Sequence, residues 1–113
     1  PVKMLYVIGA DTMGRGNEQL GWALLQTYVQ TIKDVRPLPH KIVLYNSGVW
    51  LVATESGALE ALRSLQEAGV EILACGTCLD FYQLKSAIQV GQISNMHEIM
   101  TAMAEADKIV SPF

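Results

Sequence analysis

The sequence predicts an α/β fold: a three-layer α/β/α domain, flavodoxin-like in outline, around a mostly parallel five-stranded sheet. Short runs rich in Val and Ile alternate along the chain with segments of helical periodicity. The first of these runs has a continuous apolar stretch over residues 4–8, which is typical of parallel strands buried on both faces. Half of the 113 residues are apolar, which is enough for one sizeable core, so we expect a single domain over residues 1–113.

The first half of the chain is expected to form two strands around a long helix. Residues 2–11 form the first apolar run and residues 41–46 the second, which is followed by an exit loop at 47–50. Between them, apolar residues that recur every four positions predict a helix over 17–34. These residues are Leu20, Leu24, Tyr28 and Ile32. Gly21 lies inside this helix, where glycine costs roughly 1 kcal/mol relative to alanine. We therefore expect Gly21 to pack closely against a strand or a second subunit.

The middle of the chain is expected to add a second helix and a third strand. A helix is predicted over 56–68, where the glycine that follows it is a typical helix stop. The apolar run at 70–75 then predicts the third strand. Thr77 followed by Asp80 matches the capping-box pattern, so we expect a short helix to begin near Cys78.

The last third of the chain is expected to end the sheet. Residues 90–93 predict a weaker fourth strand and residues 108–110 a short fifth strand. Asn95 followed by Glu98 is a signal for a helix N-terminus between them. One face of this helix is apolar, and we expect that face to belong to the core. Its residues are Met96, Ile99, Met100 and Met103.

A polar, glycine-containing segment follows each of the first three strands. Ligands of open α/β sheets bind outside the carboxyl ends of the strands, so we expect these segments to form one site. The segments are "GADTMGRGN", "NSGVW" and "CGTCLD". The candidate binding residues in them are Asp11, Gly14, Arg15, Gly16, Asn46, Ser47, Gly76 and Thr77.

Each of these binding residues also has a simpler interpretation. Arg15 is the only cation in the three loops, so it either steadies an anion or is an exposed arginine. Asp11 either orients Arg15 or caps the following helix. Gly14 and Gly16 either present backbone N–H groups as an anion nest or only shape a turn. The side chains of the "NS" pair offer hydrogen bonds, which a plain turn explains equally well.

Two cysteines at a junction between strand and helix are the most informative feature of the chain. Cys75 ends the third predicted strand, and Cys78 falls near the start of the short helix. Such a pair is interpreted as a metal clip, a redox dithiol, a sulfur carrier, or two cysteines that only pack. A thiolate is the reactive form, and we expect the helix start to favour it at both positions.

Several other classes of function are disfavoured by the composition. The net charge is −3 and no basic block is present, which argues against nucleic acid or an anionic membrane as the main partner. No apolar stretch approaches the ~20 residues of a membrane span. No secretory signal is recognisable, so we expect a cytoplasmic protein. The only other zinc ligands of the usual N/S type are the distant His40 and His97, and neither a P-loop nor a GxGxxG fingerprint is present. We therefore expect no metal and no cofactor.

The chain resembles the DsrE/DsrF-like superfamily, and most closely the C-terminal domain of YedF-type proteins. The resemblance spans nearly the whole chain and is carried by "GADTMGRGNEQLG", "LYNSGVWL", "GVEILACGTCLDFYQL", "VGQISNM" and "ADKIV". It implies a sulfurtransferase-like domain that carries sulfur as a cysteine persulfide, with an association to selenium metabolism. Relatives with one cysteine in this segment have it at the strand end, which implies Cys75 as the acceptor and Cys78 as its helper. YedF-type proteins also carry a TusA-like domain with a Cys-Pro motif, which this sequence lacks.

Two alternatives remain open beside the sulfur carrier. A thioredoxin-like dithiol oxidoreductase also has CxxC between a strand and a helix, although this chain lacks the proline of a Cys-Gly-Pro-Cys motif. A non-catalytic domain that only binds a partner is the other. The resemblance implies a sulfur donor or acceptor protein, of which a TusA-like protein is one kind, and a homo-oligomer. The apolar run at 49–52 is either a covered loop or a contact between subunits.

Overall fold

Five parallel strands form one sheet in the computed structural model, which describes residues 2–53 and 55–113. The strand order is β4-β3-β2-β1-β5, and every neighbouring pair is parallel. The strands are β1 (Met4–Ile8), β2 (Lys41–Leu44), β3 (Glu71–Cys75), β4 (Gln92–Ser94) and β5 (Lys108–Val110). The predicted fold class is therefore confirmed. Two residues of the expected domain, Pro1 and Thr54, lie outside the described ranges.

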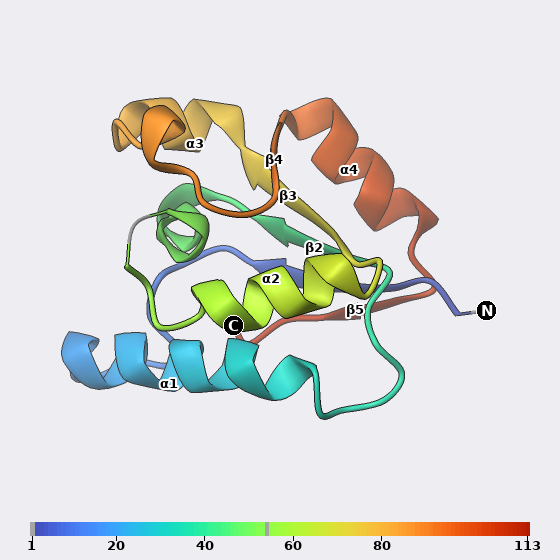
Figure 1. Ribbon diagram of the computed structural model, residues 1–113, viewed down its shortest axis with the longest axis horizontal. Coiled ribbons are helices and arrows are strands. Elements are labelled where there is room, and N and C mark those ends of the chain that lie inside the picture. The colour runs from blue at the N-terminus through green and yellow to red at the C-terminus, as the bar shows by residue number, and fades with distance from the viewer. Residues whose placement is uncertain (1, 54) are drawn as a thin grey trace.

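Helices cover both faces of the sheet. They are α1 (Glu18–Ile32), α2 (Leu59–Glu67), α3 (Gly76–Phe81) and α4 (Met96–Glu105), with two 3₁₀ helices, η1 (Asn46–Val52) and η2 (Lys85–Ala87). Helices α1 and α2 lie side by side on one face, α4 covers the other, and α3 follows the carboxyl end of β3 (Figure 1). Within 2–53 and 55–113, none of these helices has the length and apolar character needed to cross a bilayer.

Helix α1 is confirmed, and of the four residues whose spacing predicted it only Ile32 is buried. The side chain of Asn17 caps the helix by accepting the N–H of Leu20 at 2.8 Å. The residues that face the core are Gly21, Leu25, Val29 and Ile32. Leu20 and Leu24 precede this stripe by one position, which is about 100° around the helix, and both are exposed. Two adjacent rows of α1 repeat every four residues, and both contain apolar side chains. Packing against the sheet determines which of the two rows is buried.

The segment after β2 is more ordered and more buried than an exit loop. It forms the 3₁₀ helix η1, in which Val49, Leu51 and Val52 are fully buried. The apolar run at 49–52 is thus covered by the chain's own core. Strand β4 also differs slightly, because it begins two residues later than predicted.

Helix α3 begins earlier than the capping-box pattern indicated. Its first residue is Gly76, and Cys75 occupies the N-cap position without a side-chain hydrogen bond to the helix. The expected start near Cys78 is therefore wrong. Gly76 lies close to β4, where only a residue without a side chain fits well. A Cβ on Gly76 would meet the Ser94 carbonyl oxygen at 3.0 Å and the Ile93 side chain at 3.1 Å.

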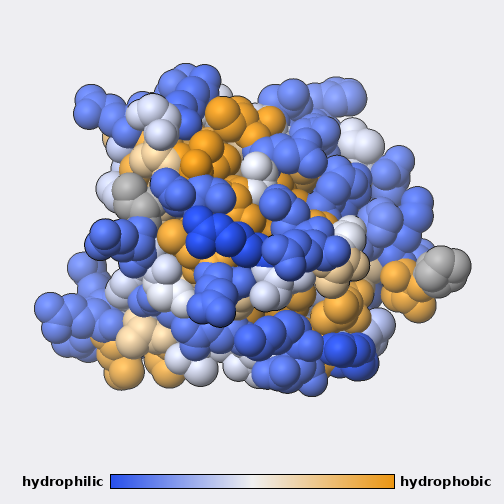
Figure 2. Space-filling model, viewed as in Figure 1, coloured by the Kyte–Doolittle hydropathy of each residue, from blue (hydrophilic) through white to orange (hydrophobic). Residues whose placement is uncertain are grey.

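Helix α4 confirms its predicted cap but not its predicted core face. Asn95 accepts the N–H of Glu98 at 2.8 Å. Ile99 is fully buried, whereas Met96 and Met100 are mostly exposed. The expectation that the methionine stripe is core is therefore wrong for these two residues, because the helix rests on the sheet along the row of Ile99 and Ala102. Apolar surface is visible between α3 and α4 in Figure 2.

Candidate functional site

The loops after β1, β2 and β3 all lie at the carboxyl edge of the sheet (Figure 1). Asp11 follows β1, Asn46 is the first residue of η1 after β2, and Cys75 is the last residue of β3. Parallel strands in register bring these positions to the same edge although they are far apart in the sequence. The structure thus brings together the elements that carry the predicted site.

Two contacts fasten the first loop to the second. The backbone N–H of Asp11 donates to the hydroxyl oxygen of Ser47 at 3.0 Å. Gly48 lies so close to the end of β1 that a Cβ there would collide with the carbonyl oxygen of Ile8. Only glycine permits this approach. Ser47 therefore links the loop after β2 to the loop after β1 by a hydrogen bond. The close packing of Gly48 on the end of β1 holds the same two loops together.

Asn46 connects the second loop to the cysteines. Its backbone N–H donates to the sulfur of Cys78 at 3.0 Å. Its side-chain carbonyl oxygen accepts the hydroxyl of Tyr82 at 3.0 Å. The residue adopts a left-handed backbone conformation with φ of 48°, which asparagine tolerates better than most residues. Tyr82 thus holds Asn46 in the conformation that directs its N–H at the sulfur.

The two cysteines are neighbours with different environments. Cys75 is only 2% exposed, whereas Cys78 is half-buried. Burial and a hydrogen bond with the Cys75 side chain raise the pKa of the Cys78 thiol above its ordinary value of 9.0, although the Asn46 N–H acts to lower it. The expected gain in thiolate character at the helix start is therefore outweighed at Cys78. In the resting protein this sulfur is held mainly as a thiol.

A pocket of about 280 Å³ opens beside Cys78. Its lining residues are Asn46, Thr77, Cys78, Phe81 and Tyr82, and none of these described residues is charged. Phe81 is 79% exposed at its rim, and its ring meets that of Tyr82 edge to face at 5.1 Å. Tyr82 also packs on Trp50 of η1, with ring centroids 5.7 Å apart. The pocket therefore offers a thiol in an aromatic, uncharged setting.

Some predicted site residues lie outside this pocket. Gly14, Arg15 and Gly16 are exposed on the loop after β1, and both glycines have positive φ. Gly76 is buried against β4. Gly21 packs closely, as expected, but its neighbours are Thr12 and Met13 rather than a strand. At Gly21 the helix therefore packs on the loop after β1, while its later buried residues Leu25, Val29 and Ile32 belong to the core.

Sequence reasoning missed Phe81 and Tyr82 as site residues. A signal was present, because residues three and four positions beyond a helical residue lie on the same face as that residue. Phe81 and Tyr82 stand at these positions relative to Cys78. The sequence "CLDFY" therefore indicated two aromatic rings beside the second cysteine.

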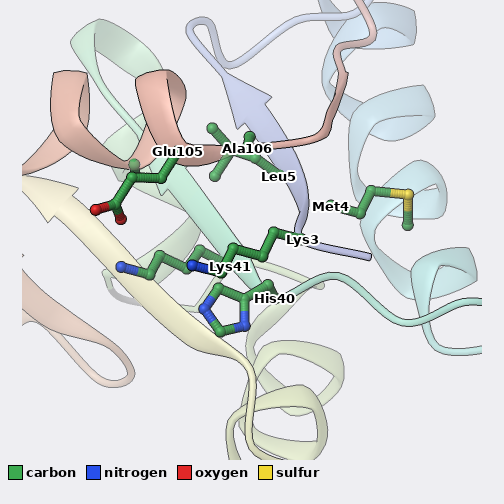
Figure 3. Close-up of a pocket in the computed structure, with 8 residues that line it drawn as sticks. Lys3, Met4, Leu5, His40, Lys41, Glu105 and Ala106 are labelled. Atoms are coloured by element: carbon green, nitrogen blue, oxygen red, sulfur yellow. The ribbon is translucent and has the colours of Figure 1, made fainter. Parts of the chain in front are cut away.

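A second, much smaller cavity lies at the opposite, amino edge of the sheet. Figure 3 shows the side chains of Lys3, His40, Lys41 and Glu105 around it. Its volume is about 10 Å³, which suits at most one water molecule. Among residues 2–53 and 55–113, no three His, Cys, Asp or Glu side chains are grouped closely enough to hold a metal ion.

Comparison with known proteins gives a family and a fold. The model of the DsrE/DsrF-like family matches residues 9–112. A comparison with curated protein sequences gives no match. The ychN protein from E. coli is similar in structure, with a TM-score of 0.71 and 16% identity over 98% of this chain and 99% of that one. Protein MTH1491 from Methanobacterium thermoautotrophicum has a TM-score of 0.70 and 19% identity, over 99% and 100% of the two chains. Protein BT1422 from Bacteroides thetaiotaomicron has a TM-score of 0.63 and 20% identity, over 96% and 94%.

Proposed function

The chain belongs to the DsrE/DsrF-like family, and from this membership and its paired thiols we propose that it is a sulfur carrier. It accepts sulfur as a cysteine persulfide at the Cys75–Cys78 pair and passes it to a partner. The family is associated with sulfur relay. The single observation that supports this function best is the Cys78 sulfur, which faces an open pocket, receives a backbone N–H and has a second thiol beside it.

The transfer step needs only a thiolate and a donor persulfide. The carrier sulfur attacks the outer sulfur of a donor R–S–SH, the sulfur–sulfur bond of the donor breaks, and R–S⁻ leaves with the electron pair. The product is a carrier persulfide, and the reverse step hands the sulfur onward. A backbone N–H directed at the sulfur, as from Asn46, stabilises negative charge there during attack. The chain supplies this donor without needing a cation.

The surroundings of the pocket favour a protein as the donor or acceptor. An anionic small molecule would find no charged side chain among the described lining residues. An exposed aromatic residue such as Phe81 is instead typical of the anchors that bind protein partners. We therefore propose a partner that presents its own persulfide or thiol on a protruding segment, as a TusA-like protein would.

Intact-mass measurement after incubation with a persulfide donor tests this function. We expect the wild type to gain sulfur from glutathione persulfide or to show the products of its discharge. The double variant Cys75→Ser/Cys78→Ser should do neither. Thermal unfolding of both proteins controls for folding. If the wild type reacts with no donor while both thiols alkylate readily, the carrier function is wrong.

The dithiol oxidoreductase is the second candidate, because both cysteines are free and lie together at the start of α3, one at the N-cap and one in the first turn. Such a pair is expected to cycle between dithiol and disulfide and to reduce protein disulfides. Insulin reduction with a dithiol as the electron source tests it. Fast reduction without any sulfur uptake would favour this alternative over the carrier.

A further inference from the structure

The two thiols of the site differ in their access to the pocket. Cys78 lines the 280 Å³ pocket, and its sulfur is the one that receives the Asn46 N–H. Cys75 is 2% exposed at the end of β3 and does not line this pocket in the described residues. A persulfide that enters through the pocket therefore reaches Cys78 before it reaches Cys75.

We propose, resting on the sulfur-carrier function, that Cys78 takes up the sulfur and that Cys75 discharges it as hydrosulfide by closing a Cys75–Cys78 disulfide. The site is then a persulfide reductase as well as a carrier. These roles are the reverse of those that the family resemblance implies. The reason for the reversal is accessibility, because the strand-end thiol is buried in this chain and the second thiol faces the pocket.

The discharge step balances without an added base. The Cys75 thiol attacks the inner sulfur of the Cys78 persulfide anion, which is its Sγ. The bond between Sγ and the outer sulfur breaks, and the outer sulfur leaves as HS⁻ with the proton of the Cys75 thiol. The disulfide takes the place of the persulfide, and the outer sulfur is reduced by the two electrons of that bond. An external dithiol then reduces the disulfide and resets the pair.

Geometry favours attack on the inner sulfur. Cys75 is the N-cap residue of α3, and Cys78 lies three residues later in the first turn of that helix. Residues three apart across one helical turn are neighbours, and disulfides need Cα atoms roughly 4.4–6.8 Å apart. An added outer sulfur extends into the pocket, because that is where the free volume lies. It therefore points away from Cys75, and the Sγ stays within reach.

The choice of leaving group favours the same outcome. Thiol exchange is faster when the departing sulfur is the conjugate base of a stronger acid. Burial and the contact with Cys75 raise the pKa of the Cys78 thiol, which makes Cys78 a poor leaving group. Hydrosulfide is the better one. The pair is thus biased toward release of sulfide rather than toward moving the sulfur from Cys78 to Cys75.

A single-turnover experiment on the full chain tests the proposal. Reduced protein is mixed with glutathione persulfide, desalted at once, and followed by intact mass and by sulfide detection. For the wild type we expect one equivalent of sulfide per chain and a mass lower by two hydrogens than the reduced protein. Peptide mapping should find the Cys75–Cys78 disulfide. A wild type that keeps the added sulfur and releases no sulfide overturns the proposal.

Two single variants separate the roles. Cys75→Ser should take up one sulfur on Cys78 and hold it, with sulfide release slowed at least about tenfold because the resolving thiol is absent. Cys78→Ser should take up none. Because Cys75 is buried, Cys75→Ala serves as a second variant, and alkylation of Cys78 reports that the pocket is intact in both. If Cys78→Ser gains sulfur on Cys75, the roles are wrong although the carrier function stands. If neither the wild type nor any variant reacts, the carrier function itself fails.

Discussion

The cavities at the carboxyl and amino edges of the sheet are lined by different kinds of side chain. The carboxyl edge has a 280 Å³ pocket with a thiol and no charged lining residue among those described. The amino edge has Lys3, His40, Lys41 and Glu105 around only about 10 Å³ (Figure 3). Lys41 is also within 3.8 Å of the Glu71 carboxylate. The charged side chains thus line the cavity that is too small for a ligand, and the Cys78 thiol lines the larger one.

The absence of charged residues from the described lining of the larger cavity is consistent with the raised pKa of Cys78. A cation beside Cys78 would favour the thiolate, as it does in many reactive cysteines. The carboxyl edge instead provides burial, a second thiol and one backbone N–H, and the balance raises the pKa of Cys78. The candidate site therefore holds Cys78 mainly as a thiol and not as a thiolate.

The largest expected effect concerns pH. Because the pKa of Cys78 is raised above 9.0 in the folded protein, its alkylation should quicken about tenfold per pH unit up to a midpoint above that value. Rate measurements with iodoacetamide and peptide mapping test this, and the same thiol in denaturant should titrate at its ordinary value. The folded state holds this proton more tightly, so the contribution to stability is present below pH 9 and falls as pH rises through the raised pKa. A midpoint below that of the unfolded chain would contradict the comparison of the two edges.

The next effect concerns the partner. Phe81→Ala removes the exposed ring at the rim of the pocket, so sulfur transfer from a protein donor should slow by about tenfold, as for an interface anchor. Uptake from glutathione persulfide should hardly change. Phe113→Ala is the matched control, because Phe113 is also exposed but does not line the pocket in the described structure. Equal losses with both kinds of donor would mean that Phe81 shapes the site rather than binding a partner.

Much of the fold was predictable because buried parallel strands have a simple sequence pattern. Apolar runs located β1, β2 and β3, and Asn95 with Glu98 located the start of α4. The row of a helix that faces the core was harder to predict, because apolar residues also occupied neighbouring rows of α1 and α4. The distinction depends on contacts with the sheet, which a period of 3.6 residues does not contain.

The site was predictable in its location but not in its composition. The rule for carboxyl ends of strands located Asn46, Cys75 and Cys78 correctly on one edge. It could not say that Cys75 is buried while Cys78 faces a pocket, because α3 begins at Gly76 rather than near Cys78. The start of α3 also packs against β4 at Gly76, and β4 is remote in sequence.

A stability measurement sharpens the comparison of the edges. Gly48→Ala would force a Cβ against the Ile8 carbonyl oxygen, so we expect a loss of about 1–3 kcal/mol in the free energy of unfolding. Lys3→Ala at the amino edge changes an exposed side chain and should stay within about 0.5 kcal/mol. Denaturant unfolding measures both. A tolerated Gly48→Ala would mean that the end of β1 and η1 can move apart, and that the loops of the site are not held as rigidly as argued.

The smallest effect compares two tyrosine hydroxyls. The hydroxyl of Tyr82 donates to the Asn46 side chain, so Tyr82→Phe should cost about 1 kcal/mol of unfolding free energy. It should also slow sulfur uptake, because Asn46 would be less firmly positioned to donate its N–H to Cys78. The hydroxyl of Tyr28 on α1 is buried without a hydrogen-bond partner in the described structure, and burial raises the pKa of Tyr28 to about 12. Tyr28→Phe should therefore be neutral or slightly stabilising. Denaturant unfolding and single-turnover uptake measure both variants. If both lose the same stability and neither changes uptake, the Tyr82 hydroxyl does not position the site, and the special role given to the carboxyl edge rests on the two thiols alone.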